Sequence, residues 1–210
     1  MSMSQASETV RVLSWNVLRR VGAGPEDVAA LIAKHRPDLV LLQEADRTMD
    51  RLPDLIGGSY ARDAFAGRIH GPAFWSAAPV ARPELVRLSG GHTRRHAQVV
   101  RFGALTFVNV HLGHGQITCR RQLREAAQCI DGAGAVIGDF NMIGPAVLPG
   151  FNDVGPREPT HFARDLLPVR IDRCFARGLS CLSASTLPPG RSDHRPILLT
   201  LAVETAALAA

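Results

Sequence analysis

The sequence predicts a single α/β domain, and three observations support this prediction. Short apolar segments bounded by glycine, proline or polar residues, at residues 10–17, 39–42, 105–111 and 135–137, are typical of buried strands. Segments 25–36 and 117–130 repeat their apolar residues at helical spacing. The chain has 210 residues, of which 46% are hydrophobic and 20% are charged, enough for one well-buried core. We therefore expect one domain over residues 10–204, with loose termini at 1–9 and 205–210.

Two strand–helix–strand segments share one spacing. Asn16 and Glu44 end the strands of the first segment, His111 and Asp139 end those of the second, and each pair is 28 residues apart. Two similar halves that pack face to face would bring these polar strand ends to one rim. Residue identity between the halves is negligible, so a chance coincidence explains the spacing equally well.

Local signals define the other elements. Pro25 and the acidic residues that follow it favour a helix start, and Pro37 ends that helix. Short strands are expected at residues 73–76, 84–88, 97–102, 169–175 and 197–203. Residues 47–71 are rich in turn-forming and charged residues and are expected to form a loop with little regular structure.

Composition limits the partners and the compartment. A formal charge of +5 and a pI of about 9.7 suit a polyanion such as nucleic acid. The charge is scattered, however, and a solvated face is the simpler interpretation of its three local pairs, Arg19-Arg20, Arg94-Arg95 and Arg120-Arg121. No apolar run approaches the roughly 20 residues that span a bilayer, and no signal peptide is evident, so we expect a cytoplasmic protein without membrane insertion. The four cysteines lack a CxxC pair and are expected to be reduced.

Polar side chains follow several of the apolar strands. Residues 135–142 read AVIGDFNM, so Asp139 and Asn141 come directly after a strand, where both can face a hard cation or a phosphate. Further polar residues at the ends of similar runs are expected to converge on them: Asn16, Glu44, His111, Asp172, Asp193 and His194. Carboxylate and amide oxygens suit Mg²⁺ or Mn²⁺.

Six short motifs occur in a fixed order: SWNV, LLQE, VNVHL, GDFN, RIDRCF and SDHRP. In this order they resemble the endonuclease/exonuclease/phosphatase superfamily of DNase-I-like, metal-dependent phosphoesterases. The motifs span residues 11–200, essentially the whole expected domain. The resemblance implies a four-layer αββα sandwich of two mixed β-sheets flanked by helices, and a divalent-metal-dependent hydrolase of phosphate esters.

The resemblance also implies roles for the motif residues. Metal ligands would be Glu44, with Asn16 close by and Asp193 completing the shell. Asp139 would orient or deprotonate the attacking water, and Asn141 would hold a phosphate oxygen.

The two motif histidines would act on either side of the phosphate. His194 would contact the scissile phosphate, with Asp172 fixing its ring and raising its pKa. His111 would lie near the leaving group as a donor or general acid. Arg20 and His114 are further candidates for substrate binding.

Three positions depart from the pattern of the superfamily. In residues 71–80, which resemble a strand with the sequence GNAILSR and place Ser76 near its serine, Pro72 replaces the usual asparagine and Ala77 the usual basic residue. Leu18 stands where some apurinic-site endonucleases carry an aspartate. None of these removes the expected metal site, but together they argue against any one subfamily.

The leading functional hypothesis is a monomeric Mg²⁺-dependent phosphodiesterase acting as an endo- or exonuclease on DNA or RNA. The alternative is a phosphatase or phospholipase-type enzyme for a small phosphoester or lipid headgroup, because aromatic residues for base stacking are few. A non-catalytic binding domain is the weakest hypothesis, since the whole set of motif residues is present.

Overall fold

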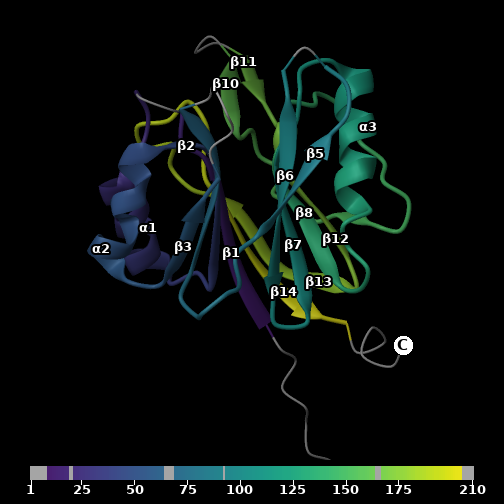
Figure 1. Cartoon of the computed structure of the whole chain (residues 1–210). Helices are drawn as coiled ribbons and strands as arrows, with labels where there is room; N and C mark the ends of the chain where they lie inside the picture. Colours follow the sequence, from purple (N-terminus) through teal and green to yellow (C-terminus); the bar gives the residue numbers. More distant parts are fainter. Residues whose placement is uncertain (1–8, 19–20, 64–68, 92, 164–166, 205–210) are drawn as a thin grey trace, which may run out of the picture.

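The computed structural model describes residues 9–18, 21–63, 69–91, 93–163 and 167–204. Two six-stranded mixed sheets pack face to face, and helices cover their outer faces (Figure 1). Helices α1 (Pro25–His35) and α2 (Leu52–Ile56) lie on one side of the molecule, and α3 (Gln116–Ala127) lies on the other. The predicted αββα sandwich is confirmed.

The first sheet, here called sheet A, has the strand order β13-β14-β1-β2-β4-β3. Its strands are β1 (Thr9–Asn16), β2 (Leu39–Asp46), β3 (Ser59–Arg62), β4 (His70–Ser76), β13 (Leu179–Thr186) and β14 (Ile197–Val203). The second, sheet B, has the order β5-β6-β7-β8-β12-β9. It comprises β5 (Glu84–Leu88), β6 (Arg95–Phe102), β7 (Leu105–His111), β8 (Gly134–Asp139), β9 (Asn152–Asp153) and β12 (Asp172–Arg177). A separate two-stranded sheet pairs β10 (His161–Ala163) with β11 (Leu167–Val169).

The two segments with the same spacing are equivalent units of the fold. β1 pairs in parallel with β2 after α1, and β7 pairs in parallel with β8 after α3. Each parallel pair is flanked by antiparallel strands, β14 and β4 in sheet A and β6 and β12 in sheet B. The carboxyl ends of β1, β2, β7 and β8 therefore meet at one rim, as the spacing suggested.

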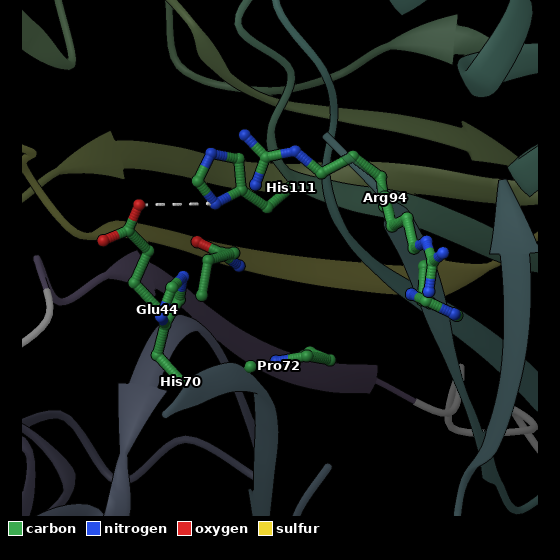
Figure 2. Close-up of a pocket in the computed structure, with 9 residues that line it drawn as sticks. Glu44, His70, Pro72, Arg94 and His111 are labelled. Atoms are coloured by element: carbon green, nitrogen blue, oxygen red, sulfur yellow. Dashed lines mark ion pairs between the residues drawn. The ribbon is translucent and has the colours of Figure 1, made fainter. Parts of the chain in front are cut away.

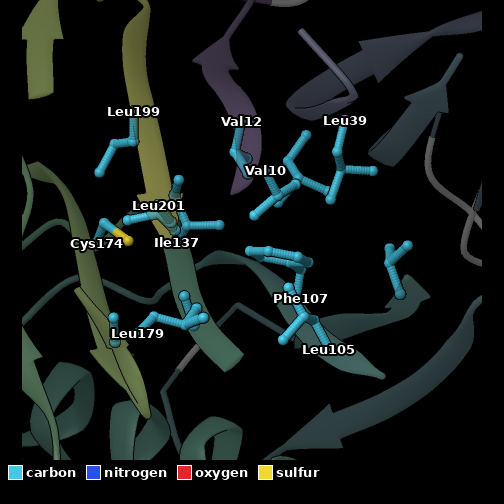
Figure 3. Close-up of a cluster of buried hydrophobic side chains, with 14 of the residues drawn as sticks. Val10, Val12, Leu39, Leu105, Phe107, Ile137, Cys174, Leu179, Leu199 and Leu201 are labelled. Atoms are coloured by element: carbon cyan, nitrogen blue, oxygen red, sulfur yellow. The ribbon is translucent and has the colours of Figure 1, made fainter. Parts of the chain in front are cut away.

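The main core lies between the sheets and explains the continuous apolar runs (Figure 3). Val12, Leu39 and Phe107 face this layer and are almost completely buried. Alternate residues such as Leu13 and Val40 pack instead beneath α1 and α2. Because these strands are covered on both faces, neither face needs polar residues, and the strands read as unbroken apolar segments.

A hydrogen-bonded chain of buried amides joins the two sheets behind the rim. Gln43 Nε2 donates to Asn109 Oδ1 at 2.8 Å, and Asn109 Nδ2 donates to Gln98 Oε1 at 3.0 Å. Asn109 Nδ2 also donates to the backbone oxygens of Leu42 and Ala73. Buried amides are costly unless they are paired, so this network favours one relative position of the two sheets.

Some predicted elements are wrong in extent. Residues 47–71 are not a simple loop, because they contain a 3₁₀ turn, η1 (Arg47–Arg51), followed by α2, β3 and the start of β4. The strand expected at 169–175 is two separate strands, β11 and β12. Strand β13 was not predicted; it lies at the edge of sheet A, and most of its residues are partly or fully exposed.

Two further observations concern the whole described chain. All four cysteines are free thiols, as expected. Among the helices in the described ranges, none has the length and apolar character that crossing a bilayer requires.

Candidate active site

Four polar side chains at the ends of the parallel strand pairs meet across the gap between the sheets. Asn16, at the end of β1, donates from Nδ2 to Asp139 Oδ2 at the end of β8, over 3.0 Å. His111, at the end of β7, places Nε2 3.4 Å from Asp139 Oδ2 and Nδ1 3.8 Å from Glu44 Oε1. Each sheet therefore supplies two of the four groups.

Glu44 owes its position to an irregularity in β2. The pairing of β2 with β4 shifts between Leu42 and Ala45, which is typical of a bulge. Glu44 there has a φ of 59°, in the left-handed region that non-glycine residues rarely adopt. Gln43 is buried, whereas Glu44 lines the cleft, so the irregularity separates a structural residue from a functional one. Strain of this kind is common at sites where a side chain must be held ready for a ligand.

Asp139 and Asn141 form a tight turn after β8. The backbone N–H of Asn141 donates to Asp139 Oδ1 at 2.9 Å, and Asn141 has a φ of 49°. One proton of Asn141 Nδ2 is directed to the carbonyl of Leu112 at 3.1 Å. Gly138 allows the approach of β7, because a Cβ there would lie 2.1 Å from the carbonyl oxygen of Val110. The turn thus fixes the carboxylate and leaves the second amide proton of Asn141 for a ligand.

His194 is held by hydrogen bonds on both its ring and its backbone. Its Nδ1 lies 2.9 Å from Asp172 Oδ2, and Trp15 Nε1 donates to its carbonyl oxygen at 2.9 Å. Its backbone N–H donates to Ser192 Oγ at 3.1 Å. Asp172 is fixed in turn, because its backbone N–H donates to Thr160 Oγ1 at 2.9 Å. The predicted Asp172–His194 pair is therefore a rigid unit.

The charges of this unit follow from its surroundings. Burial alone lowers the pKa of His194, but the charges of Asp172 and Asp139 and the hydrogen bond to Asp172 raise it to about 10. Burial alone raises the pKa of Asp139, but the neighbouring histidines and its hydrogen bonds outweigh burial and hold it below its usual range. At neutral pH His194 is a cation, and its Nε2 lies 3.8 Å from the Asp139 carboxylate.

His111 carries no charge at neutral pH. Burial lowers its pKa to about 3, although the charge of Asp139 opposes this shift. A neutral imidazole has one N–H, which it can donate to only one of its two carboxylate neighbours. His111 is thus suited to donate a hydrogen bond rather than to act as a fixed cation.

The donor set at the rim fits the divalent metal that the sequence predicted. Glu44 offers carboxylate oxygens, and Asn16 offers Oδ1, whose orientation is fixed because Nδ2 donates to Asp139. Hard oxygen ligands of this kind suit Mg²⁺ or Mn²⁺. Asp193 faces a different neighbourhood, with Oδ2 3.8 Å from His161 Nδ1 and Oδ1 4.0 Å from His194 Nε2. Its place in the metal shell stays a prediction.

These residues line a cleft of about 510 Å³. The described residues of its wall are Asn16, Leu18, Glu44, His70, Thr93, Arg95, His111, His114, Asp139, Asn141, His161, Ile171, Asp193 and His194. A small hollow of about 30 Å³ adjoins it, where Glu44 and His111 face each other and Arg94 lies at the opposite end (Figure 2). Glu44, His70, Arg95 and His111 line both spaces, and Arg95 together with Arg94 places positive charge on this side.

The structure places the remaining described residues that the sequence singled out in different parts of the fold. His114 lines the cleft, and its role in substrate binding stays a prediction. Arg20 lies outside the described residues. Ser76 is fully buried and pairs with Leu39 at the start of β2, so it lies at the end of sheet A opposite Glu44 and outside the cleft.

His161 belongs to the cleft but was left unassigned by sequence reasoning. Its ring centroid lies 4.4 Å from that of His194, with 36° between the ring planes. An isolated β-bridge between His161 and His194 places it there. This contact joins segments more than 30 residues apart, and no local pattern distinguishes His161 from the other unassigned histidines.

An αββα sandwich with oxygen ligands at its rim and a histidine held by a carboxylate defines a protein of the DNase-I-like class. The model of the Endonuclease/Exonuclease/phosphatase family matches residues 13–194, and the chain belongs to this family. Members of this family are phosphoester hydrolases that depend on a divalent metal.

Solved structures share the fold at low sequence identity. An endonuclease/exonuclease/phosphatase from Bacteroides vulgatus is 17% identical, with a TM-score of 0.79 over 94% of this chain and 100% of that one. A protein of the same description from Beutenbergia cavernae is 19% identical, with a TM-score of 0.73 over 93% and 72% of the two chains. TDP2 of D. rerio, solved in complex with a single-strand DNA product, is 18% identical, with a TM-score of 0.73 over 92% and 98%. No curated protein matches the chain.

Proposed function

We propose that the protein hydrolyses phosphodiester bonds with Mg²⁺ or Mn²⁺, and that its substrate is DNA or RNA. One observation carries this proposal: the cationic ring of His194, held by Asp172, lies 3.8 Å from the ionised carboxylate of Asp139. A charged donor for a phosphate oxygen and a charged acceptor for a water proton thus stand side by side. Hydrolysis of a phosphate ester requires both groups.

Each neighbouring side chain has a role in this scheme. A bound metal ion would neutralise charge on the nonbridging phosphate oxygens. Asp139 orients the attacking water and accepts its proton, and Nε2–H of His194 donates to a phosphate oxygen as negative charge develops. The second Nδ2 proton of Asn141 holds another phosphate oxygen. Neutral His111 donates a hydrogen bond near the leaving group.

The basic side of the cleft supports a nucleic acid substrate. Arg94 and Arg95 line the adjoining hollow, Arg95 also lines the cleft, and Arg94 is exposed. Contacts to several phosphates provide much of the affinity of proteins for nucleic acids. TDP2 of D. rerio, which shares the fold, has been solved with single-strand DNA.

A small phosphoester or lipid headgroup is the second candidate, and one observation favours it. No phenylalanine, tyrosine or tryptophan is among the described residues of the cleft wall. Trp15, Phe74 and Trp75 are 2%, 2% and 4% exposed and cannot stack on bases.

Hydrolysis of two chromogenic substrates tests the reaction class. Bis-p-nitrophenyl phosphate should be cleaved with Mg²⁺ or Mn²⁺ and not with EDTA, and p-nitrophenyl phosphate should be a poor substrate. Asp139→Ala and His194→Ala should each lower the rate by about 10²-fold or more. Preference for the monoester would favour a phosphatase, and equal metal-dependent rates in wild type and both variants would overturn the proposal.

Nicking of supercoiled plasmid and cleavage of oligonucleotides then test the substrate class. Arg94→Ala should raise the KM for oligonucleotides about 2–10-fold. It should also make that KM depend less steeply on salt concentration, because one phosphate contact is lost. Arg124→Ala is the matched control, because Arg124 is an exposed arginine on α3 away from the cleft. If the protein cleaved bis-p-nitrophenyl phosphate but neither nicked the plasmid nor cleaved oligonucleotides, the small-phosphoester candidate would be favoured.

A further inference from the structure

His161, Asp193 and His194 form a second cluster of potential ligands beside the site already described. One donor atom from each residue lies within 4.8 Å of the other two. His161 comes from the β10–β11 hairpin, whereas the other two precede β14. The cluster offers two imidazoles and one carboxylate, a different donor set from the oxygen ligands of Glu44 and Asn16.

One nitrogen of each ring is fixed by a hydrogen bond, as is usual in metal-binding histidines. Nδ1 of His194 is held by Asp172 at 2.9 Å, and Nδ1 of His161 lies 3.1 Å from the carbonyl oxygen of Asp193. A carbonyl oxygen only accepts hydrogen bonds, so Nδ1 of His161 is the donor to Asp193, and the same atom lies 3.8 Å from Asp193 Oδ2. Metal-binding histidines typically have one ring nitrogen fixed by a carboxylate or a backbone carbonyl in this way.

Asp193 provides an independent observation. Its Oδ1 is buried and has no hydrogen-bond partner, although it lies only 4.0 Å from His194 Nε2. A buried carboxylate oxygen without a partner is costly, and a cation relieves that cost. The side chain of Asp193 is 38% exposed, so this oxygen can move toward a cation that enters from the cleft.

We propose that His161, Asp193 and His194 bind a transition-metal ion such as Zn²⁺, and that this binding inhibits the enzyme. Two imidazoles and one carboxylate suit Zn²⁺ better than Mg²⁺, which prefers oxygen ligands and bound water. Binding displaces the Nε2 proton of His194 into solvent, which removes the hydrogen-bond donor assigned to the phosphate. The inhibition rests on the proposed function, whereas the binding does not.

The first test measures Zn²⁺ binding directly, by titrating Zn²⁺ into the full chain in a buffer that contains Mg²⁺. Isothermal titration should show one site that His161→Phe weakens at least about tenfold; phenylalanine keeps an aromatic ring over His194 but has no ligand nitrogen. His114→Phe, which changes a cleft histidine outside the cluster, should bind Zn²⁺ like wild type. His161→Ala should weaken binding as His161→Phe does. Equal affinity in wild type and His161→Phe would overturn the proposal.

Co²⁺ provides a spectroscopic check of the ligands. The visible bands of bound Co²⁺ should lack thiolate charge transfer, because the cluster contains no cysteine. Intense charge-transfer bands would assign the ion to a cysteine and refute the site.

Inhibition is measured separately, on bis-p-nitrophenyl phosphate at saturating Mg²⁺. The rate of each variant is divided by its own rate without Zn²⁺. Half inhibition of His161→Phe should require at least about tenfold more Zn²⁺ than half inhibition of wild type. Unchanged inhibition in this variant would overturn the inhibitory role. If the chain did not hydrolyse the diester at all, the proposed function would fail and the titrations would still test the site.

Discussion

Replacement of Asp172 by asparagine should lower the pKa of His194 while leaving its ring in place. The substitution keeps the size of the side chain and a hydrogen-bonding oxygen beside Nδ1 but removes the negative charge. Within the unfolded chain His194 has an ordinary pKa of 6.5, and in the folded protein it is raised to about 10. Such a difference corresponds to about 4–5 kcal/mol in favour of the imidazolium.

Asp172 provides the largest part of that stabilisation, with Asp139 contributing next. The side chain of His194 is only 7% exposed, so solvent screens the pair little. We expect Asp172→Asn to lower the free energy of unfolding by about 3 kcal/mol near pH 6.5, the lower end of the range for breaking a buried pair. Because the folded pKa is the higher one, this stabilisation is complete below pH 6.5 and is lost as the pH rises through about 10. The gap between wild type and variant should therefore narrow at alkaline pH.

The assay has two parts. Urea unfolding at several pH values measures the stability gap, and the rate of diester hydrolysis is followed from neutral to alkaline pH at saturating metal. Wild-type activity should fall near pH 10, and the fall should move at least about one pH unit lower in Asp172→Asn. Asp63→Asn is the control, because Asp63 is a buried carboxylate that accepts a hydrogen bond from Gln98 and pairs with Arg82. A variant profile that coincides with wild type, or a stability gap that does not depend on pH, would refute this account of His194.

Three further substitutions probe the metal ligand, the sheet interface and the turn. Glu44→Gln should raise the Mg²⁺ concentration needed for half-maximal activity and lower kcat/KM about 10²–10³-fold, because it removes a charged ligand; a metal titration that matches wild type would contradict this. Asn109→Leu should cost about 2–4 kcal/mol in urea unfolding, because it removes the donor to buried Gln98 Oε1 and to the Ala73 carbonyl; a neutral effect would show that the network is dispensable. Gly138→Ala should lower the thermal midpoint by several degrees, because its Cβ would lie 2.1 Å from the Val110 oxygen; an unchanged midpoint in calorimetry would mean that β7 shifts freely.

The sequence predicted those parts of the fold in which burial dictates composition. β1, β2, β7 and β8 are covered on both faces, so their apolar runs stand out, and the helices between them repeat with a clear period. β13 was missed because it lies at an edge, where it pairs with β14, and most of its residues are partly or fully exposed, which allows the polar sequence LSCLSAST. Residues 47–71 were misjudged because their two short helices and β3 are too short to show a period.

The site residues likewise fall into those that the sequence predicts and those that it does not. Residues such as Asn16 and Asp139 end strands that the sequence predicts clearly, so their convergence could be inferred from strand ends alone. His161 comes from a three-residue strand, and contacts with residues more than 30 positions away in the sequence place it in the cleft. Asp193 lies near His161 and His194, and this proximity likewise depends on side-chain directions that no local sequence pattern predicts.

The order of strands along the chain has a consequence for biosynthesis. Sheet B is built from one continuous stretch, 84–177, whereas sheet A needs strands from both 9–76 and 179–203. β1 lies between β2 and β14, so during synthesis one of its edges stays unpaired until β14 has been made. An unpaired edge exposes hydrogen-bonding groups to other chains, which makes the incomplete protein prone to association. Asp193 and His194 are synthesised in the same late stretch. A chain that ends before them therefore lacks both the strand that pairs with β1 and two of the residues that line the cleft.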